Sequence, residues 1–341
     1  MKDATLTAPL DMLACPRCRA DLEYQDSHIV CKGCAQCFTM TSNIPQFYWG
    51  NDDWGNEKGD VTETIKAFYE QTPFPNYDNF DDTASLIDKA KEGVFARLLD
   101  EQIPAHAKIL EVGCGTGQLS AFLSVANRTV YGADMCMNSL QLAENFRNKN
   151  QLKNLHLLQM NLFRPAFKDG GFDLVISNGV LHHTSDPRLA FNTIARLVKP
   201  GGYILIGLYH KYGRLITDTR RLIFSVAGDS LDFLDPHLRK VRASGGKWKA
   251  WFMDQYHNPH ESKHTISETM PWFDEEGFDV LKTIPKTKLF SQFTDREKLF
   301  QKDEFGSSFE RTLVELGMIT KGSAEGGFFI VIGKKRRVHA K

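Results

Sequence analysis

A short apolar strand that runs into three alternating glycines is the feature that most constrains the fold of this chain. The segment 108–117 contains Glu111, followed by Gly113, Gly115 and Gly117. Because glycine lacks a Cβ atom, the backbone can turn sharply there and approach a bound ligand closely. The next apolar segment, 129–133, ends at Asp134, where the second strand of a βαβ unit would present a carboxylate to ribose hydroxyls. The pattern predicts a Rossmann-like α/β fold with a ligand-binding turn after its first strand.

The rest of the chain after residue 107 alternates between strand-like and helix-like segments. We expect strands at 107–112, 129–133, 155–160, 172–177, 203–209, 278–283 and 327–333. We expect helices at 117–126, 137–149, 187–198 and 267–276, and a turn at 199–202. This alternation predicts a seven-stranded, mostly parallel sheet with helices on both faces.

Four of the seven cysteines form two Cys-x-x-Cys pairs, made by Cys15, Cys18, Cys31 and Cys34. Each pair can fold into a knuckle that points two thiolates at one ion, and the 12 residues between the pairs read as a hairpin. The spacing predicts a closed, structural Zn²⁺ site in a small zinc ribbon, which the metal would help to fold. A redox pair is the weaker alternative. Cys37 is more simply explained as a spare thiol than as a ligand.

The glycine turn with Glu111 and Asp134 resembles the first motif of class I methyltransferases that use S-adenosylmethionine (SAM). The segment 172–184 resembles the fourth motif of that superfamily, and 199–202 resembles its later turn. Together, the matching segments cover most of residues 105–210. The resemblance implies a SAM site across the carboxyl ends of the strands.

The resemblance also assigns roles to residues at the strand ends. Glu111, the three glycines and Asp134 would hold the donor. Asn161 stands where related enzymes often carry Asp; its side-chain oxygen would accept a hydrogen bond from the adenine amino group, and Leu162 would contact the ring. Asn178 would lie near the methionine end of SAM.

Histidines dominate the expected acceptor side. His182 and His183 follow the fourth strand, where a histidine could remove a proton from the acceptor, although a structural role stays open for each. An expected insertion at 210–266 contains candidate substrate-binding residues, for which metal binding and structural packing stay open as alternatives: Tyr256, His257, His260 and His264. A second insertion is expected near 285–325.

These observations divide the chain into three parts. Residues 1–48 form the expected zinc ribbon, which resembles small zinc-ribbon proteins that act as partners of some methyltransferases. Residues 49–104 would be a linker and helical cap, and 105–337 the catalytic domain with its insertions.

Composition narrows the function classes. The chain has 42 basic and 42 acidic residues, so no global field attracts nucleic acid. It contains no apolar run of about 18 residues and no secretory signal, so we expect a cytoplasmic protein with no membrane partner.

Three functional hypotheses follow. We favour a SAM-dependent methyltransferase that acts on a small or medium-sized organic acceptor. The alternatives are an rRNA or tRNA methyltransferase that binds RNA through its zinc ribbon, and a non-catalytic SAM-binding scaffold.

Overall fold

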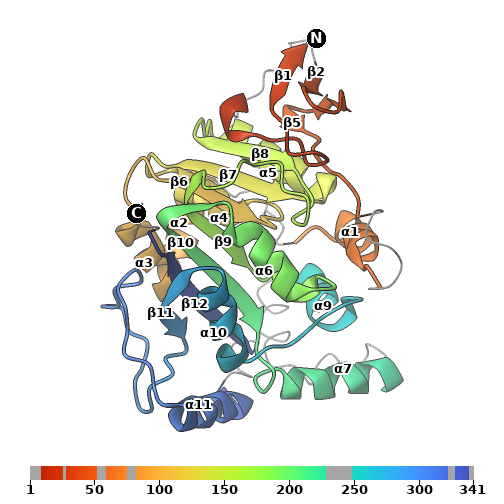
Figure 1. The fold of residues 1–341 in the computed structure, drawn as a ribbon. Coiled ribbons are helices and arrows are strands. Elements are labelled where there is room, and N and C mark those ends of the chain that lie inside the picture. Colours follow the sequence, from red (N-terminus) through yellow and green to blue (C-terminus); the bar gives the residue numbers. More distant parts are fainter. Residues whose placement is uncertain are drawn as a thin grey trace.

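A seven-stranded sheet with helices on both sides forms the centre of the protein (Figure 1). The computed structural model describes residues 9–25, 28–51, 59–74, 82–227, 248–321 and 327–337. The strand order is β11-β12-β10-β9-β6-β7-β8, and β12 runs antiparallel to both of its neighbours while the other pairs are parallel. The strands are β6 (Lys108–Val112), β7 (Thr129–Asp134), β8 (Leu155–Gln159), β9 (Phe172–Asn178), β10 (Val198–Tyr209), β11 (Phe278–Ile284) and β12 (Phe328–Lys335). The predicted fold class is confirmed.

Alternation along each strand divides the core between the two faces of the sheet. Leu110 and Val175 belong to one apolar cluster, whereas their neighbours Ile109 and Leu174 belong to the other. This follows from the strand period of two residues, and it explains why these strands are apolar throughout. The first cluster is covered by α6 (Pro187–Ala195) and α10 (Ile266–Glu275), and the second by α3 (Val94–Gln102), α4 (Gln118–Ser124) and α5 (Met137–Lys149).

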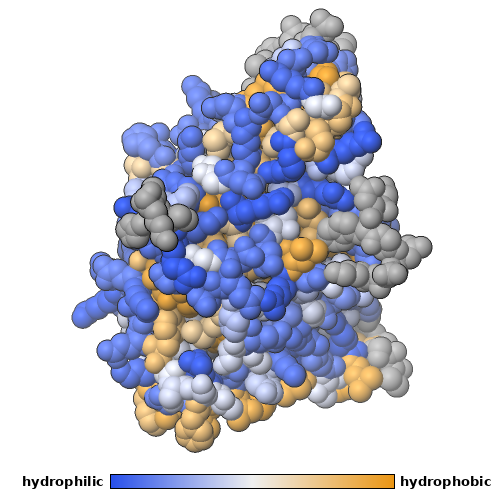
Figure 2. Space-filling view, in the orientation of Figure 1, coloured by the Kyte–Doolittle hydropathy of each residue, from blue (hydrophilic) through white to orange (hydrophobic). Residues whose placement is uncertain are grey.

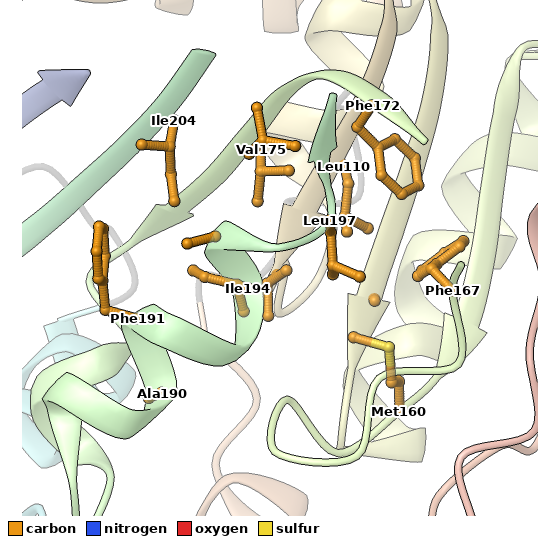
Figure 3. Close-up of a cluster of buried hydrophobic side chains, with 14 of the residues drawn as sticks. Leu110, Met160, Phe167, Phe172, Val175, Ala190, Phe191, Ile194, Leu197 and Ile204 are labelled. Atoms are coloured by element: carbon orange, nitrogen blue, oxygen red, sulfur yellow. The ribbon is translucent and has the colours of Figure 1, made fainter. Parts of the chain in front are cut away.

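Figure 3 shows how α6 packs on the first face. Phe191 and Ile194 project from the helix toward Val175 on β9 and Ile204 on β10, and all four side chains are fully buried. Asp186 caps the helix, because its side chain accepts a hydrogen bond from the Leu189 N–H, and Pro187 occupies the first helical position. A capped start and an apolar inner face thus hold α6 beside the strand ends that carry the site.

Two boundaries differ from the sequence prediction by three residues or more. The segment 199–202, expected as a turn, lies within β10, which starts at Val198 and shifts register before Tyr203. The glycines of this segment therefore lie at a break in the strand pairing, and the strand itself starts before them. α6 ends at Ala195, three residues before the expected boundary. Parts of the two expected insertions, 228–247 and 322–325, lie outside the described residues.

The cysteine-rich segment packs against the β8 edge of the sheet. Its elements are η1 (Leu10–Met12), β1 (Leu22–Gln25), β2 (His28–Cys31), β3 (Cys37–Phe38), β4 (Met40–Thr41) and β5 (Ile44–Pro45). The Phe47 N–H donates to the Gln159 carbonyl on β8 (2.9 Å), and Arg19 donates to the carbonyls of Pro165 and Phe167. Leu13 and Phe47 are fully buried in the same apolar cluster as the sheet. The segment is therefore part of the main core.

The remaining helices are α1 (Thr62–Gln71), α2 (Thr83–Glu92), the short 3-10 helix η4 (Leu181–His183), α7 (Leu215–Ala227), α9 (Trp248–His257) and α11 (Ser308–Lys321). None of the helices in the described segments combines the length and apolar character needed to cross a bilayer. The face seen in Figure 2 is mostly hydrophilic, and its apolar residues form several separate groups, some of them at the end that carries α7 and α11. Exposed apolar side chains there include Leu222 and Phe309.

Candidate active site

A cavity of about 590 Å³ lies along the carboxyl ends of the parallel strands. Its wall takes residues from five neighbouring strands, in the order Asn161 just after β8, Asp134 on β7, Glu111 on β6, Asn178 on β9 and Tyr209 on β10. Four strand spacings of about 4.8 Å make this row about 19 Å long. Open α/β sheets bind ligands at this position.

The glycine turn that follows β6 lines the cavity through Gly113 and Gly115. Gly113, Gly115 and Gly117 have φ values of +74°, +53° and +73°, a region that L-residues with a side chain rarely occupy. A Cβ atom on Gly113 would lie only 2.4 Å from Cγ2 of Val180. Gly117 does not line the cavity but caps the start of α4. The turn thus needs glycine for its conformation and, at Gly113, for space as well.

Replacing Gly113 by alanine should destabilise the protein by about 2–5 kcal/mol, because the left-handed backbone and the overlap with Val180 each add cost. The matched control is Gly170→Ala. Gly170 has a φ of +71° but no atom within 4 Å of the added Cβ, so only about 1–2 kcal/mol should be lost. Denaturant unfolding measures both values, and equal losses would contradict the steric argument.

Asp134 holds the glycine turn in place. Its Oδ2 accepts a hydrogen bond from the Gly115 N–H and its Oδ1 accepts one from the Cys136 N–H, both at 2.8 Å. Burial raises the pKa of Asp134, and these two backbone donors oppose that rise. On β6, Glu111 accepts a hydrogen bond from the Ser120 hydroxyl, and burial raises the pKa of Glu111 to about 7. Both carboxyl groups therefore stand in the wall with defined partners.

Asn161 ties the segment after the ribbon to the cavity. Its amide donates to the Trp49 carbonyl and to Oδ1 of Asn51, each at 2.9 Å, and its oxygen accepts from the Phe163 N–H at 3.0 Å. The oxygen that the sequence assigned to adenine thus already accepts a backbone hydrogen bond. Leu162, the next residue, lines the cavity as apolar surface.

The two adjacent histidines differ in their surroundings. His183 lines the cavity, and its Nδ1 lies 2.9 Å from the His260 carbonyl. A carbonyl only accepts, so Nδ1 carries the proton and Nε2 keeps a lone pair in the neutral ring. Burial lowers the pKa of His183, which favours that neutral ring.

His182 does not belong to the cavity wall. It is fully buried, its ring packs 4.1 Å from the Tyr209 ring between centroids, and neither ring nitrogen has a hydrogen-bond partner among the described residues. Burial lowers the pKa of His182 well below its usual value. The structure therefore gives His182 a packing position rather than the expected position beside the acceptor.

The expected substrate residues also lie outside the cavity wall. Tyr256 packs on Phe224, with ring centroids 4.7 Å apart, and the His257 ring lies against Phe252. The His260 Nε2 is 3.1 Å from the Thr184 carbonyl, while His264 lies between Ser262 and Glu268. In the part of the chain that the structure describes, these histidines form no metal-binding group.

Four residues that the sequence analysis did not select form the wall beside His183: Tyr69, Tyr209, Asp254 and Gln255. The Tyr69 hydroxyl donates to Oδ1 of Asp254 (2.6 Å), and Gln255 Nε2 donates to the Tyr209 hydroxyl (2.6 Å) and to Oδ2 of Asp254 (3.0 Å). Asp254 and Gln255 immediately precede the histidine-rich segment, which is a signal in the sequence that could have found them. We call these four residues and His183 the acceptor wall.

Comparison with protein families fits this geometry. Residues 110–206, which contain the glycine turn, Asp134 and Asn178, match a family described as a methyltransferase domain. These residues therefore form a methyltransferase domain.

Curated relatives are similar to about a third of this chain. An uncharacterized methyltransferase of Mycobacterium bovis is 34% identical over 110 residues, which cover 32% of this chain and 54% of the relative. The ubiquinone biosynthesis O-methyltransferase of Escherichia fergusonii is 32% identical over 108 residues, which cover 31% of this chain and 45% of the relative. The chain spans about half the length of the curated relatives it matches. The solved structure of PKMT2 from Rickettsia typhi is 14% identical and covers 77% of this chain and 56% of its own, with a TM-score of 0.49.

The cysteine cluster lies apart from the methyltransferase cavity, in the ribbon. The sulfur atoms of Cys15, Cys18, Cys31 and Cys34 all lie within 4.8 Å of one another. Those of Cys18 and Cys31 are 3.3 Å apart, and those of Cys15 and Cys34 are 3.8 Å apart. Four sulfurs held tetrahedrally at 2.3 Å from Zn²⁺ would be roughly 3.8 Å apart. The N–H groups of Gly33 and Cys34 lie 3.3 and 3.4 Å from the Cys31 sulfur, as expected for a knuckle that stabilises a thiolate. The donor set and its spacing fit Zn²⁺.

Proposed function

We propose that this protein transfers the methyl group of SAM to a small or medium-sized organic acceptor. The observation that carries the proposal is the single cavity of about 590 Å³, which joins the glycine turn and Asp134 to the polar acceptor wall. Cavities of this size suit small molecules. The similarity to a ubiquinone biosynthesis O-methyltransferase supports an organic acceptor, although that similarity covers only 31% of this chain.

The strand order supports a direction for the bound donor. The adenine would lie near Leu162 after β8, the ribose at Asp134 on β7, and the methionine part between the glycine turn and Asn178. The reacting methyl would then point toward β10, where the acceptor wall begins. Among the residues proposed to bind the donor, Asn161 would act mainly by holding residues 49–51 against the adenine end of the cavity.

Methyl transfer depends mainly on how the protein positions the donor and the acceptor, and less on catalytic groups. SAM supplies a methyl group on a positively charged sulfur, which is activated before it binds. The protein must align the acceptor atom with that methyl, exclude water, and remove a proton where the acceptor carries one. His183 is the proposed proton acceptor, because its Nδ1–H is fixed by the His260 carbonyl and its Nε2 keeps a lone pair.

We also propose that the cysteine cluster binds one structural Zn²⁺. Four protein ligands leave no open coordination position for an acceptor. The metal would instead stabilise the ribbon, whose buried residues pack on the β8 edge.

Transfer of a labelled methyl group tests the proposed function. The protein is incubated with SAM labelled in its methyl group, and separately with a small-molecule extract and with total RNA. We expect label in one or a few small molecules, and none with an Asp134→Ala variant. Label incorporated into RNA, or no incorporation while the donor product still binds, would contradict the proposal.

A further inference from the structure

The acceptor wall contains a carboxylate without a cationic partner. Asp254 lies on α9 and is 6% exposed. Its two oxygens accept hydrogen bonds from neutral donors, the Tyr69 hydroxyl and the Gln255 amide. Among the described residues, no lysine or arginine forms an ion pair with it. Burying a charge without a countercharge is unfavourable, so a ligand that supplies one would be favoured here.

The charged side chains near Asp254 interact with other groups or lie at other parts of the cavity. The buried Arg214 behind the wall pairs with Glu261 at 2.9 Å, and its guanidinium lies 3.9 Å from the centre of the Tyr209 ring. Two further carboxyl groups line the cavity, Glu111 and Asp134, but they stand at the donor end on β6 and β7. Among the described residues that line the cavity, the one ammonium is that of Lys89, which is exposed and belongs to α2. The negative charge of Asp254 therefore belongs to the acceptor end.

Aromatic rings surround the same position. The Tyr69 and His183 ring centroids are 6.0 Å apart, and those of His183 and Tyr209 are 6.1 Å apart. Phe74 and Phe328 also line the cavity. Aromatic faces attract cations, and the attraction is larger where water is excluded. A carboxylate bordered by aromatic rings is a suitable environment for a positively charged nitrogen.

We propose that the acceptor is an amine, whose positively charged nitrogen binds at Asp254 between the rings of Tyr69 and Tyr209. This inference rests on the proposed function and adds the chemical class of the acceptor. The strand order supports it, because β10 adjoins β9 and pairs Gly207 with Asn178, so that Tyr209 lies two residues beyond the strand end where the donor methyl would lie.

The reaction then balances in charge and atoms. An ammonium loses one proton to Nε2 of His183, which passes it to solvent, and the nitrogen gains a free lone pair. That lone pair forms the new N–C bond while the S–C bond breaks and its electron pair stays on sulfur. The products are S-adenosylhomocysteine and a methylated ammonium, whose positive charge again faces Asp254.

Binding of matched ligand pairs tests this inference. The full-length protein, saturated with S-adenosylhomocysteine, is screened by ligand-observed NMR against alkyl and benzyl amines, each paired with the alcohol of the same skeleton. We expect amines to bind and their alcohols to bind more weakly. In Asp254→Asn, amine affinity should fall about thirtyfold or more, because one partner of a buried charge pair is lost. The control Asp295→Asn removes an exposed carboxylate and should leave amine affinity unchanged.

The outcomes separate this inference from the proposed function. Failure of the wild-type protein to bind S-adenosylhomocysteine would overturn the proposed function itself. If that product binds but alcohols match amines, or no amine binds, the amine assignment is wrong. Equal weakening of donor-product and amine binding in Asp254→Asn would also overturn it, because Asp254 would then serve the amino group of the donor. Circular dichroism of the variant shows that its fold is kept.

Discussion

Removal of metal from the cysteine cluster should unfold the ribbon and lower the thermal stability of the whole chain. Structural zinc contributes about 10–16 kcal/mol of apparent binding free energy in small modules, so the ribbon should not stay folded without it. Leu13 and Phe47 would then leave the shared core, and their exposure alone would remove about 3–6 kcal/mol. For a chain of this size we expect the melting temperature to fall by about 10 °C or more.

The comparison of Cys15→Ser with Cys37→Ser measures this effect. Cys15 is buried in the cluster, whereas Cys37 is exposed and lies outside it. Elemental analysis should find about one zinc per chain in the wild-type protein and in Cys37→Ser, and less in Cys15→Ser. Calorimetry should show the lower melting temperature only in Cys15→Ser. Full zinc content and an unchanged melting temperature in Cys15→Ser would show that the cluster does not hold the metal.

The second large effect is expected at Asp134. Alanine at this position removes the carboxylate proposed to bind the ribose and releases the N–H groups of Gly115 and Cys136. Hydrogen bonds to charged groups contribute about 1.5–3 kcal/mol each, so losing the proposed bonds to two ribose hydroxyls should weaken binding of S-adenosylhomocysteine about a hundredfold or more. Isothermal titration calorimetry on zinc-loaded protein measures the change.

Asp134→Asn is the matched variant, because it keeps one side-chain oxygen for a backbone donor but loses the charge. We expect an intermediate affinity, with the turn better preserved than in Asp134→Ala. Unchanged donor-product affinity in both variants would remove Asp134 from the proposed donor site, whatever their thermal stability.

Local patterns in the sequence were sufficient for most of the central fold. The helix expected at 137–149 occurs as Met137–Lys149, and the strand expected at 129–133 extends by one residue to Asp134. The spacing of apolar residues in helices, the apolar runs of buried strands and glycine-rich turns are local patterns. They can therefore be recognised in the sequence without knowledge of the fold. The cysteine cluster was also predictable, since its ligands lie in two short pairs joined by a hairpin.

The acceptor wall was not predictable in the same way. Tyr69 and Asp254 are 185 residues apart and meet only because α1 and α9 come together at the same end of the sheet (Figure 1). No spacing rule connects them. The histidines near 260 were predicted to bind substrate because of their residue type. In the structure, His260 lies within hydrogen-bonding distance of the Thr184 carbonyl and His264 of Glu268, so they support the loops behind the wall.

The expected turn at 199–202 fails for a related reason. Proline and glycine normally interrupt a strand, but pairing with β9 starts at Val198 and resumes at Tyr203. Neighbouring strands therefore override the local preference. Asn161 similarly gains its partners, Trp49 and Asn51, from a distant segment that sequence spacing does not connect to it.

The pairing of the end of the ribbon with β8 also bears on self-association. β8 is the last strand on its side of the sheet, and an uncovered outer strand can join the sheet of another molecule. The contact between Phe47 and Gln159 occupies part of that strand's hydrogen-bonding edge within the same chain. Loss of this covering segment would leave the outer edge of β8 open to pairing with the sheet of another molecule.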